Sequence, residues 1–336
     1  MTDLEINGIA LVGELPYNWD RLKGKTILIS GGTGFIGSFL IDVIRYRNSH
    51  YNDNIKIVSL SRRGAVSDDT VQYLKADITE PIVYDGEADF VLHLASNTHP
   101  KQYAEDPVGT IITNIIGCDN LLKIAVEKKS RFLLASSVEI YGEGIETPVN
   151  EKYSGYIDCN QARAGYNEAK RTCEALCQSY RNQYGVDAVI VRLARIFGAD
   201  KKQDTKAMSQ FMKKALLGED IVLKSQGNQR FSYCYVADAV SGILKILLDG
   251  VSGEAYNVAG YDEGMNLRDY AEYMANLANR NVIMQIEENQ SVSKASYALM
   301  DIEKITALGW KPLYSVKEGL DVTFQIYKAR EHDSDQ

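Results

Sequence analysis

The chain contains few of the residues that metal centres and disulfide scaffolds require. Its 336 residues include five cysteines, an odd number without the spacing of a zinc ribbon, and only four histidines, which are scattered. Cys173 and Cys177 could share one helix face, but buried packing is the more common role of such a pair. No metal site is therefore expected, and the cysteines fit a reducing compartment.

An excess of basic charge is also missing. The net charge of −8 is spread along the chain without a basic stripe, which makes nucleic acid an unfavourable partner. Residues 1–5 have neither the basic nor the apolar part of a signal peptide, and no apolar run approaches the length of a membrane span. We therefore expect a cytoplasmic protein without a membrane partner. At 45% hydrophobic residues, the chain is long enough for one large or two interleaved domains.

Apolar runs typical of strands alternate with helical stretches through the first two thirds of the chain. Helices are expected at 105–128 and 162–184. This alternation predicts an α/β fold with a parallel, doubly wound sheet whose ligands bind at the carboxyl ends of the strands. The expected strands lie at residues 25–30, 55–60, 73–77, 90–95, 132–136 and 188–192.

A glycine-rich turn lies between the first strand and the helix that follows it. The match Gly32-x-Gly34-x-x-Gly37 is common by itself, and a purely structural turn gives the same pattern at least as often. Its place at a helix N-terminus, however, suits the pyrophosphate of a dinucleotide. We therefore expect residues 1–197 and 231–257 to form a Rossmann domain, with 233–248 returning to the sheet, and 198–230 and 258–330 to form a smaller, interleaved, mixed α/β substrate-binding lobe.

Tyr166 and Lys170 are four residues apart and so share one face of the expected helix. The ammonium group of Lys170 can lower the pKa of the phenol from its usual ~10 toward the working pH. The pair would then act as a proton carrier where a hydride is exchanged.

These motifs resemble the extended short-chain dehydrogenase/reductases, which modify nucleotide-linked sugars as epimerases, dehydratases, decarboxylases and reductases. The resemblance runs from about Leu22 to Trp310 and includes the segment 135–142. It implies a catalytic Ser137, Tyr166 and Lys170, and a homodimer formed through the helices at 105–128 and 162–184. The cofactor contacts that it implies are Gly31, Thr33, Gly34, Phe35, Ile36, Gly37, Ser61, Arg62, Asp77, Ile78, Leu94, Ala95, Tyr166 and Lys170.

The motifs that distinguish subfamilies conflict. Segments 163–171 and 229–233 resemble UDP-glucuronate decarboxylases, and Glu139 stands where dehydratases and decarboxylases keep a catalytic glutamate. Val138, however, replaces the acid of the sugar 4,6-dehydratases, and the arginine that decarboxylases carry shortly before Leu-Gly-Trp is missing. By resemblance, Arg230 grips the diphosphate of the substrate. Arg195 replaces an asparagine that contacts the diphosphate in many relatives; alternatively it is a surface arginine.

The end of the second strand bears on the cofactor. Enzymes that keep NAD usually place an acid there to bind the ribose 2′-hydroxyl, whereas this chain has Ser61 and Arg62, which can bind a 2′-phosphate. We therefore favour NADP(H), with NAD(H) and an Arg62 stacked on adenine as the alternative.

A net reductase consumes reduced cofactor that the cell must supply, whereas epimerases, dehydratases and decarboxylases recycle a bound cofactor. A preference for NADP(H) therefore favours net reduction. The favoured function is NADPH-dependent reduction of a nucleotide-linked keto sugar or ketose; the family resemblance alone suggests a surface-polysaccharide pathway. The alternatives are a redox-neutral NAD-dependent epimerase or decarboxylase-like enzyme and, from another class, a catalytically silent dinucleotide sensor.

Overall fold

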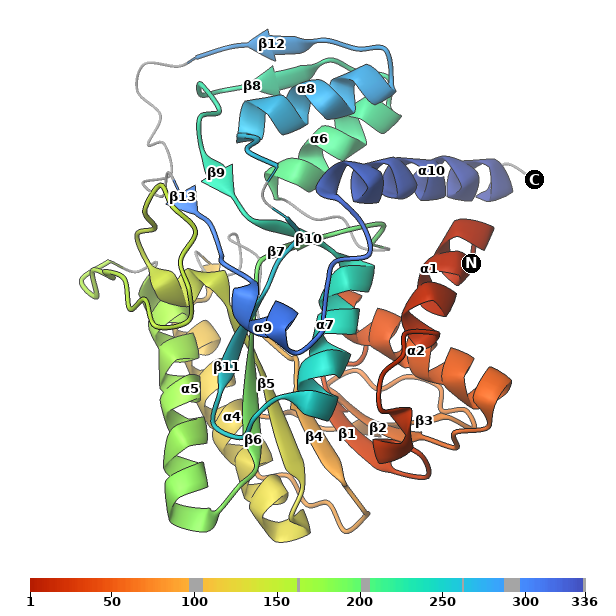
Figure 1. Ribbon diagram of the computed structural model, residues 1–336, viewed down its shortest axis with the longest axis vertical. Coiled ribbons are helices and arrows are strands. Elements are labelled where there is room, and N and C mark those ends of the chain that lie inside the picture. The colour runs from red at the N-terminus through yellow and green to blue at the C-terminus, as the bar shows by residue number, and fades with distance from the viewer. Residues whose placement is uncertain (97–104, 162–163, 201–205, 262, 287–296, 335–336) are drawn as a thin grey trace.

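The core of the molecule is a seven-stranded parallel sheet (Figure 1). The computed structural model describes residues 1–96, 105–161, 164–200, 206–261, 263–286 and 297–334. The strands are β1 (Thr26–Ser30), β2 (Lys56–Ser61), β3 (Val71–Lys75), β4 (Phe90–His93), β5 (Arg131–Ser137), β6 (Ala188–Leu193) and β11 (Ala255–Val258). Their order is β11-β6-β5-β4-β1-β2-β3, and every neighbouring pair is parallel. The predicted doubly wound α/β sheet is confirmed.

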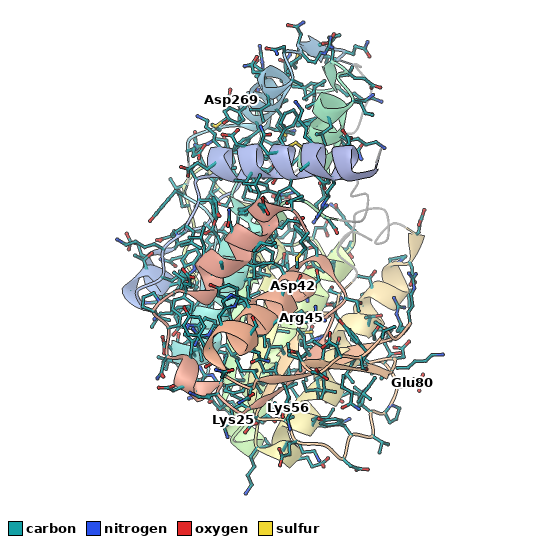
Figure 2. The ribbon with its side chains drawn as sticks, turned by 90° about the vertical axis from the view of Figure 1, so that its right-hand side faces the viewer. Lys25, Asp42, Arg45, Lys56, Glu80 and Asp269 are labelled. Atoms are coloured by element: carbon teal, nitrogen blue, oxygen red, sulfur yellow. The ribbon has the colours of Figure 1, made fainter. Side chains whose placement is uncertain are left out.

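Alternating apolar residues bury both faces of this sheet. In β1, Ile27 and Ile29 face one core and Leu28 faces the other. Helices α2 (Phe35–Tyr51) and α7 (Val236–Asp249) cover the first face, together with the N-terminal helix α1 (Asp3–Gly13). Helices α4 (Pro107–Lys128) and α5 (Ala164–Tyr184) cover the second. Figure 2 shows Asp42 and Arg45 on the outer side of α2, where they form an ion pair of 2.9 Å.

Helix α4 is long and apolar enough to cross a membrane, by length and composition only. The expectation that no run approaches that length is therefore wrong. The helix begins at Pro107 because the Asp106 side chain accepts a hydrogen bond from the Gly109 amide, and Pro is favoured at the first helical position. Cys118, Leu121 and Leu122 are fully buried against the sheet. Burial of this kind is ordinary for a core helix of a globular domain.

Most of the remaining elements lie beyond the carboxyl ends of the central strands, in the upper half of Figure 1. They include three parallel two-stranded sheets. These pair β7 (Arg195–Phe197) with β10 (Tyr233–Tyr235), β8 (Ile221–Leu223) with β12 (Val282–Met284), and β9 (Arg230–Phe231) with β13 (Tyr297–Ala298). The helices are α6 (Ala207–Leu216), α8 (Leu267–Leu277), α9 (Glu303–Ala307) and α10 (Val316–Ser334); the short 3₁₀ helices are η1 (Trp19–Arg21) and η2 (Val138–Tyr141).

Two details differ from the expectations. Residues 233–248 do not return to the central sheet as a strand, because β10 pairs with β7 and α7 packs on the sheet face; β11 supplies the seventh strand instead. That strand ends at Val258, one residue beyond the expected boundary. The start of the helix expected at 162 lies outside the described residues. The division into two domains stays a prediction.

Candidate active site

The glycine turn is shaped by close backbone contacts that exclude side chains. Gly31 has φ +83°, and a Cβ atom there would lie 2.7 Å from the amide nitrogen of Ala95. A Cβ on Gly37 would lie 2.3 Å from the carbonyl oxygen of Gly31. No side-chain cap satisfies the start of α2, where Gly34 is the N-cap residue. The first-turn amides of α2 are therefore open to an anion, as a dinucleotide-binding turn requires.

Other predicted contacts of this turn follow from its position. Thr33 is exposed in the turn, and Phe35 and Ile36 form the start of α2. Leu94 and Ala95 come directly after β4, and the Leu94 amide donates to the carbonyl oxygen of Ser30. The structure therefore brings both segments to the same end of the sheet.

A buried histidine links the ends of β1 and β4. His93 Nδ1 lies 2.8 Å from Ser30 Oγ, and the Ala95 amide donates to the same hydroxyl over 3.3 Å. Burial lowers the pKa of His93 to about 3, so the ring is neutral near pH 7. Sequence reasoning missed Ser30 as the partner of this histidine. The signal was a polar residue at the end of an apolar strand, immediately before the glycines.

The residues expected at the adenosine end of the cofactor lie together. β2 ends at Ser61, whose carbonyl oxygen accepts from the Ala76 amide, and Ile78 is buried. Hydrogen bonds from the amide and hydroxyl of Thr79 lower the pKa of Asp77, and the charge of Arg62 lowers it further. The exposed Arg62 therefore lies in the field of a carboxylate on the neighbouring strand end.

Ser137, Tyr166 and Lys170 meet where β5 contacts α5. Tyr166 and Lys170 are buried, and the phenol is hydrogen-bonded with Ser137. Lys170 donates from Nζ to the carbonyl oxygen of Ala135 over 2.9 Å, and this nitrogen lies 5.9 Å from the centroid of the Tyr166 ring. The helix spacing read from the sequence thus places the two side chains on one face.

The expected lowering of the Tyr166 pKa is wrong. Burial raises that pKa to about 12, although the Ser137 hydrogen bond acts in the opposite direction. Burial also lowers the pKa of Lys170. The cost of removing a phenolate from water dominates, so Tyr166 holds its proton near pH 7.

Glu139 and Arg195 are brought together beside this site. The Glu139 amide donates to Ser137 Oγ over 3.3 Å, and its carboxylate lies 3.4 Å from Arg195 Nη2. The Arg195 guanidinium stacks on Phe231, with Cζ 3.8 Å from the ring centroid. Arg230 is the neighbour of Phe231 on β9. The three candidate residues of this corner therefore come from η2 (Glu139), β7 (Arg195) and β9 (Arg230).

A buried polar network that sequence reasoning missed holds these elements in place. Glu174, on α5, accepts from Ser136 Oγ over 2.5 Å and pairs with Arg192 over 2.7 Å. Arg192 donates to the Tyr141 hydroxyl over 3.0 Å, and that hydroxyl donates to Asn257 over 2.5 Å. The network joins α5, β5, β6, η2 and β11. A glutamate one turn after Lys170 was the only signal for it in the sequence.

Comparison with known proteins shows the family of the chain. The model of the NAD dependent epimerase/dehydratase family matches residues 27–259, from β1 to the residue after β11. The chain belongs to this family. The resemblance read from the sequence is confirmed, and the protein is an enzyme of the extended short-chain dehydrogenase/reductase type, whose members bind NAD(P).

Its relatives in this family act on nucleotide sugars. UDP-glucuronic acid decarboxylase 3 of Arabidopsis thaliana is 32% identical over 310 residues, which cover 90% of this chain and 89% of the relative. UDP-glucuronic acid decarboxylase 1 of Danio rerio is 31% identical over 309 residues, covering 90% and 72%.

Solved structures of other family members share the fold. UDP-glucose 4-epimerase from Thermotoga maritima, with UDP-glucose, superposes with a TM-score of 0.78 at 21% identity, covering 91% of this chain and 99% of that one. dTDP-glucose 4,6-dehydratase from Bacillus anthracis, in complex with NAD, gives a TM-score of 0.76 at 20% identity, covering 92% and 98%.

Within the described ranges, no three His, Cys, Asp or Glu side chains gather as a metal site. The expectation of a metal-free enzyme stays a prediction, as do the homodimer and the cytoplasmic location.

Proposed function

We propose that this enzyme carries out a redox-neutral conversion of a nucleotide sugar, in which a hydride leaves the sugar and later returns to it. The observation that supports this best is the Glu139 carboxylate, held two residues after Ser137 and paired with Arg195. Net reduction of a keto sugar needs one proton donor, which Tyr166 can supply. A conversion that rearranges the oxidised sugar needs a second acid or base, and Glu139 is placed to serve. The decarboxylase relatives support the same choice.

The residues of the glycine turn fit a dinucleotide. A Cβ would fill the turn at Gly31 and Gly37, and the start of α2 has no side-chain cap, so a pyrophosphate can approach the backbone. A bound nicotinamide supplies the acceptor for the hydride of the sugar. We assign the pyrophosphate to Gly31, Thr33, Gly34, Phe35, Ile36 and Gly37, the adenosine end to Ser61, Arg62, Asp77 and Ile78, and the nicotinamide end to Leu94, Ala95, Tyr166 and Lys170.

Tyr166 is the proposed carrier of the proton that the sugar hydroxyl loses and regains. Burial raises its pKa to about 12, so the phenol is protonated near pH 7. The Ser137 hydrogen bond favours the phenolate, and any positive charge that binds beside the ring would favour it further. Ser137 would hydrogen-bond the oxygen of the sugar that changes oxidation state. Lys170, anchored on the carbonyl oxygen of Ala135, would fix the orientation of the cofactor ribose.

Net reduction by NADPH is the second candidate, and Arg62 is the observation that favours it. The end of β2 offers this cation and the Ser61 hydroxyl where NAD enzymes usually have an acid. Val138 and the missing arginine before Leu308 also suit a reductase, because a reductase does not need those groups. A keto sugar or ketose destined for surface polysaccharide would be its substrate. A silent dinucleotide sensor is the least favoured reading, since Ser137, Tyr166 and Lys170 are all in place.

A cofactor balance separates the two candidates. The purified enzyme is incubated with UDP-glucuronate or UDP-glucose and, in parallel, with a nucleotide-linked 4-keto sugar that a reductase could accept, first with added NAD and then with added NADPH. The absorbance at 340 nm is followed and the sugar products are identified. We expect conversion of one sugar without lasting change in reduced cofactor. Consumption of one NADPH for each product formed, with no conversion in NAD, would contradict the redox-neutral proposal and favour the reductase.

A further inference from the structure

Arg195 lies at the sugar end of the candidate site. Its guanidinium pairs with Glu139, whose own amide is bound to the Ser137 hydroxyl. The negative charge of Glu139 acts on Tyr166, where it raises the pKa of the phenol. Arg195 is therefore paired with a carboxylate that lies beside the groups expected to face the reacting part of the sugar.

The guanidinium has hydrogen-bonding capacity that its present contacts do not use. It is held in place by stacking on Phe231, which occupies the face of the group and leaves its N–H edges open. The contact with Glu139, at 3.4 Å, is longer than the 2.7–2.9 Å of a strong charge-assisted hydrogen bond. The Nε atom is buried and has no hydrogen-bond partner among the described residues. A buried N–H without an acceptor is costly, so this group is prepared for a ligand.

We infer that Arg195 is a specificity residue that binds a carboxylate carried by the sugar ring of the substrate. The inference rests on the proposed function, because it assumes a nucleotide sugar in this site. A carboxylate matches the planar N–H edge of an arginine, whose two N–H groups can bind its two oxygens. The sugar would thus be a uronate rather than a neutral hexose. The arginine that decarboxylases carry in the C-terminal segment is missing, since Ser296–Asp301 precedes Leu308-Gly309-Trp310 in this sequence.

The competing reading is that Arg195 contacts the diphosphate, as the asparagine at this position does in many relatives. The position of Arg230 favours the sugar, because Arg230 on β9 is already the expected diphosphate ligand. A diphosphate occurs in every nucleotide sugar, whereas the carboxylate occurs only in uronates, so the two readings differ in an affinity measurement.

The test compares charged and neutral sugars in protein that cannot turn over. The Tyr166→Phe protein, saturated with NAD, is titrated calorimetrically with UDP-glucuronate, UDP-glucose and UDP, and with GDP-mannuronate and GDP-mannose. The same titrations follow for Arg195→Met in that background. Arg181→Met serves as the matched control, because Arg181 is an exposed arginine in the last turn of α5, at the opposite end of that helix from Tyr166 and Lys170.

A further variant removes an ambiguity. Arg195→Met leaves Glu139 unpaired, and that bare charge could itself repel a uronate. The double variant Arg195→Met with Glu139→Gln has neither charge. If Arg195 binds the carboxylate, the double variant still binds the uronate weakly. If repulsion by Glu139 causes the loss in Arg195→Met, the affinity for the uronate recovers in the double variant.

The inference predicts that one uronate binds more tightly than its neutral counterpart. Arg195→Met should lower the affinity for that uronate by about 10- to 100-fold. The affinities for the neutral sugar and for UDP should change by less than about threefold. Equal losses for uronate, neutral sugar and UDP would overturn the inference in favour of a diphosphate contact. Recovery in the double variant, an unchanged affinity for the uronate, or no uronate that outbinds its neutral counterpart would also overturn it. These affinities do not depend on the fate of the hydride, so the proposed function fails or stands separately in the cofactor balance.

Discussion

The substitution Gly37→Ala tests whether the glycine turn is a cofactor site and not merely a tight turn. A methyl group at this position would lie 2.3 Å from the carbonyl oxygen of Gly31 and 2.8 Å from the Cα atom of Gly32. Both atoms belong to the backbone of the turn, which cannot give way as a flexible side chain does. Overpacking of this kind costs roughly 1–3 kcal/mol. The turn must move away from α2 to relieve it, and the site for the pyrophosphate is then lost.

If that strain opposes the bound shape of the turn, cofactor affinity falls by about 5- to 150-fold. The assay is calorimetric titration of wild type and variant with NAD and with NADPH, alongside thermal unfolding without cofactor. Gly8→Ala is the matched control, since the atoms nearest to its Cβ lie at 3.9 Å and the residue is in α1. Wild-type affinity for both cofactors in Gly37→Ala, with the fold intact, would refute the assignment of the turn. An equal loss in Gly8→Ala would refute the argument from steric contact.

Three other predictions follow from the site. Tyr166→Phe should keep the fold and cofactor binding but lower turnover by ~10²-fold or more, because only the transferable proton is lost; near-normal turnover in a steady-state assay would remove Tyr166 from the mechanism. His93, with a pKa lowered to about 3 against an unfolded value near 6.5, should make the protein lose stability as pH falls from about 6.5 toward 3, by up to ~1.4 kcal/mol per pH unit. Urea unfolding at pH 7, 6, 5 and 4 measures this, and a His93→Gln protein with the same slope would show that another group is responsible. Arg62→Ala should lower NADPH affinity by about one to two powers of ten and leave NADH nearly unchanged; a wild-type preference for NADH, or equal losses, would count against NADP(H).

The central sheet could be predicted from the sequence because its strands are buried on both faces and carry no ambiguity of period. Ile27, Leu28 and Ile29, for example, form an uninterrupted apolar run. The glycines and the helix that follow this run indicate that the next strand is parallel to it. The Tyr166–Lys170 pair could be placed for the same reason, since helix spacing alone sets the shared face.

The elements outside the central sheet could not be predicted as well, because their strands are two or three residues long and are defined by partners distant in sequence. β9 pairs with β13 and β7 with β10, and no local pattern encodes either pairing. The network around Glu174 could not be predicted for a similar reason. Arg192 and Asn257 come together only when the strands β5, β6 and β11 are assembled.

The protonation of Tyr166 was misjudged because its cause is burial, which sequence spacing does not report. A lysine four residues away suggested a lowered pKa, whereas the ammonium of Lys170 is directed to the carbonyl oxygen of Ala135. Burial of the phenol then decides the direction.

The most direct test of the redox-neutral account is the origin of the hydride in the product. The enzyme converts its nucleotide sugar in the presence of excess NADH and NADPH that carry deuterium at the reactive carbon of the nicotinamide, and the product sugar is examined by mass spectrometry. The account predicts a product without added deuterium, because the hydride taken from the sugar is the one returned to it. A product that gains one deuterium, with an equal amount of reduced cofactor consumed, would contradict it.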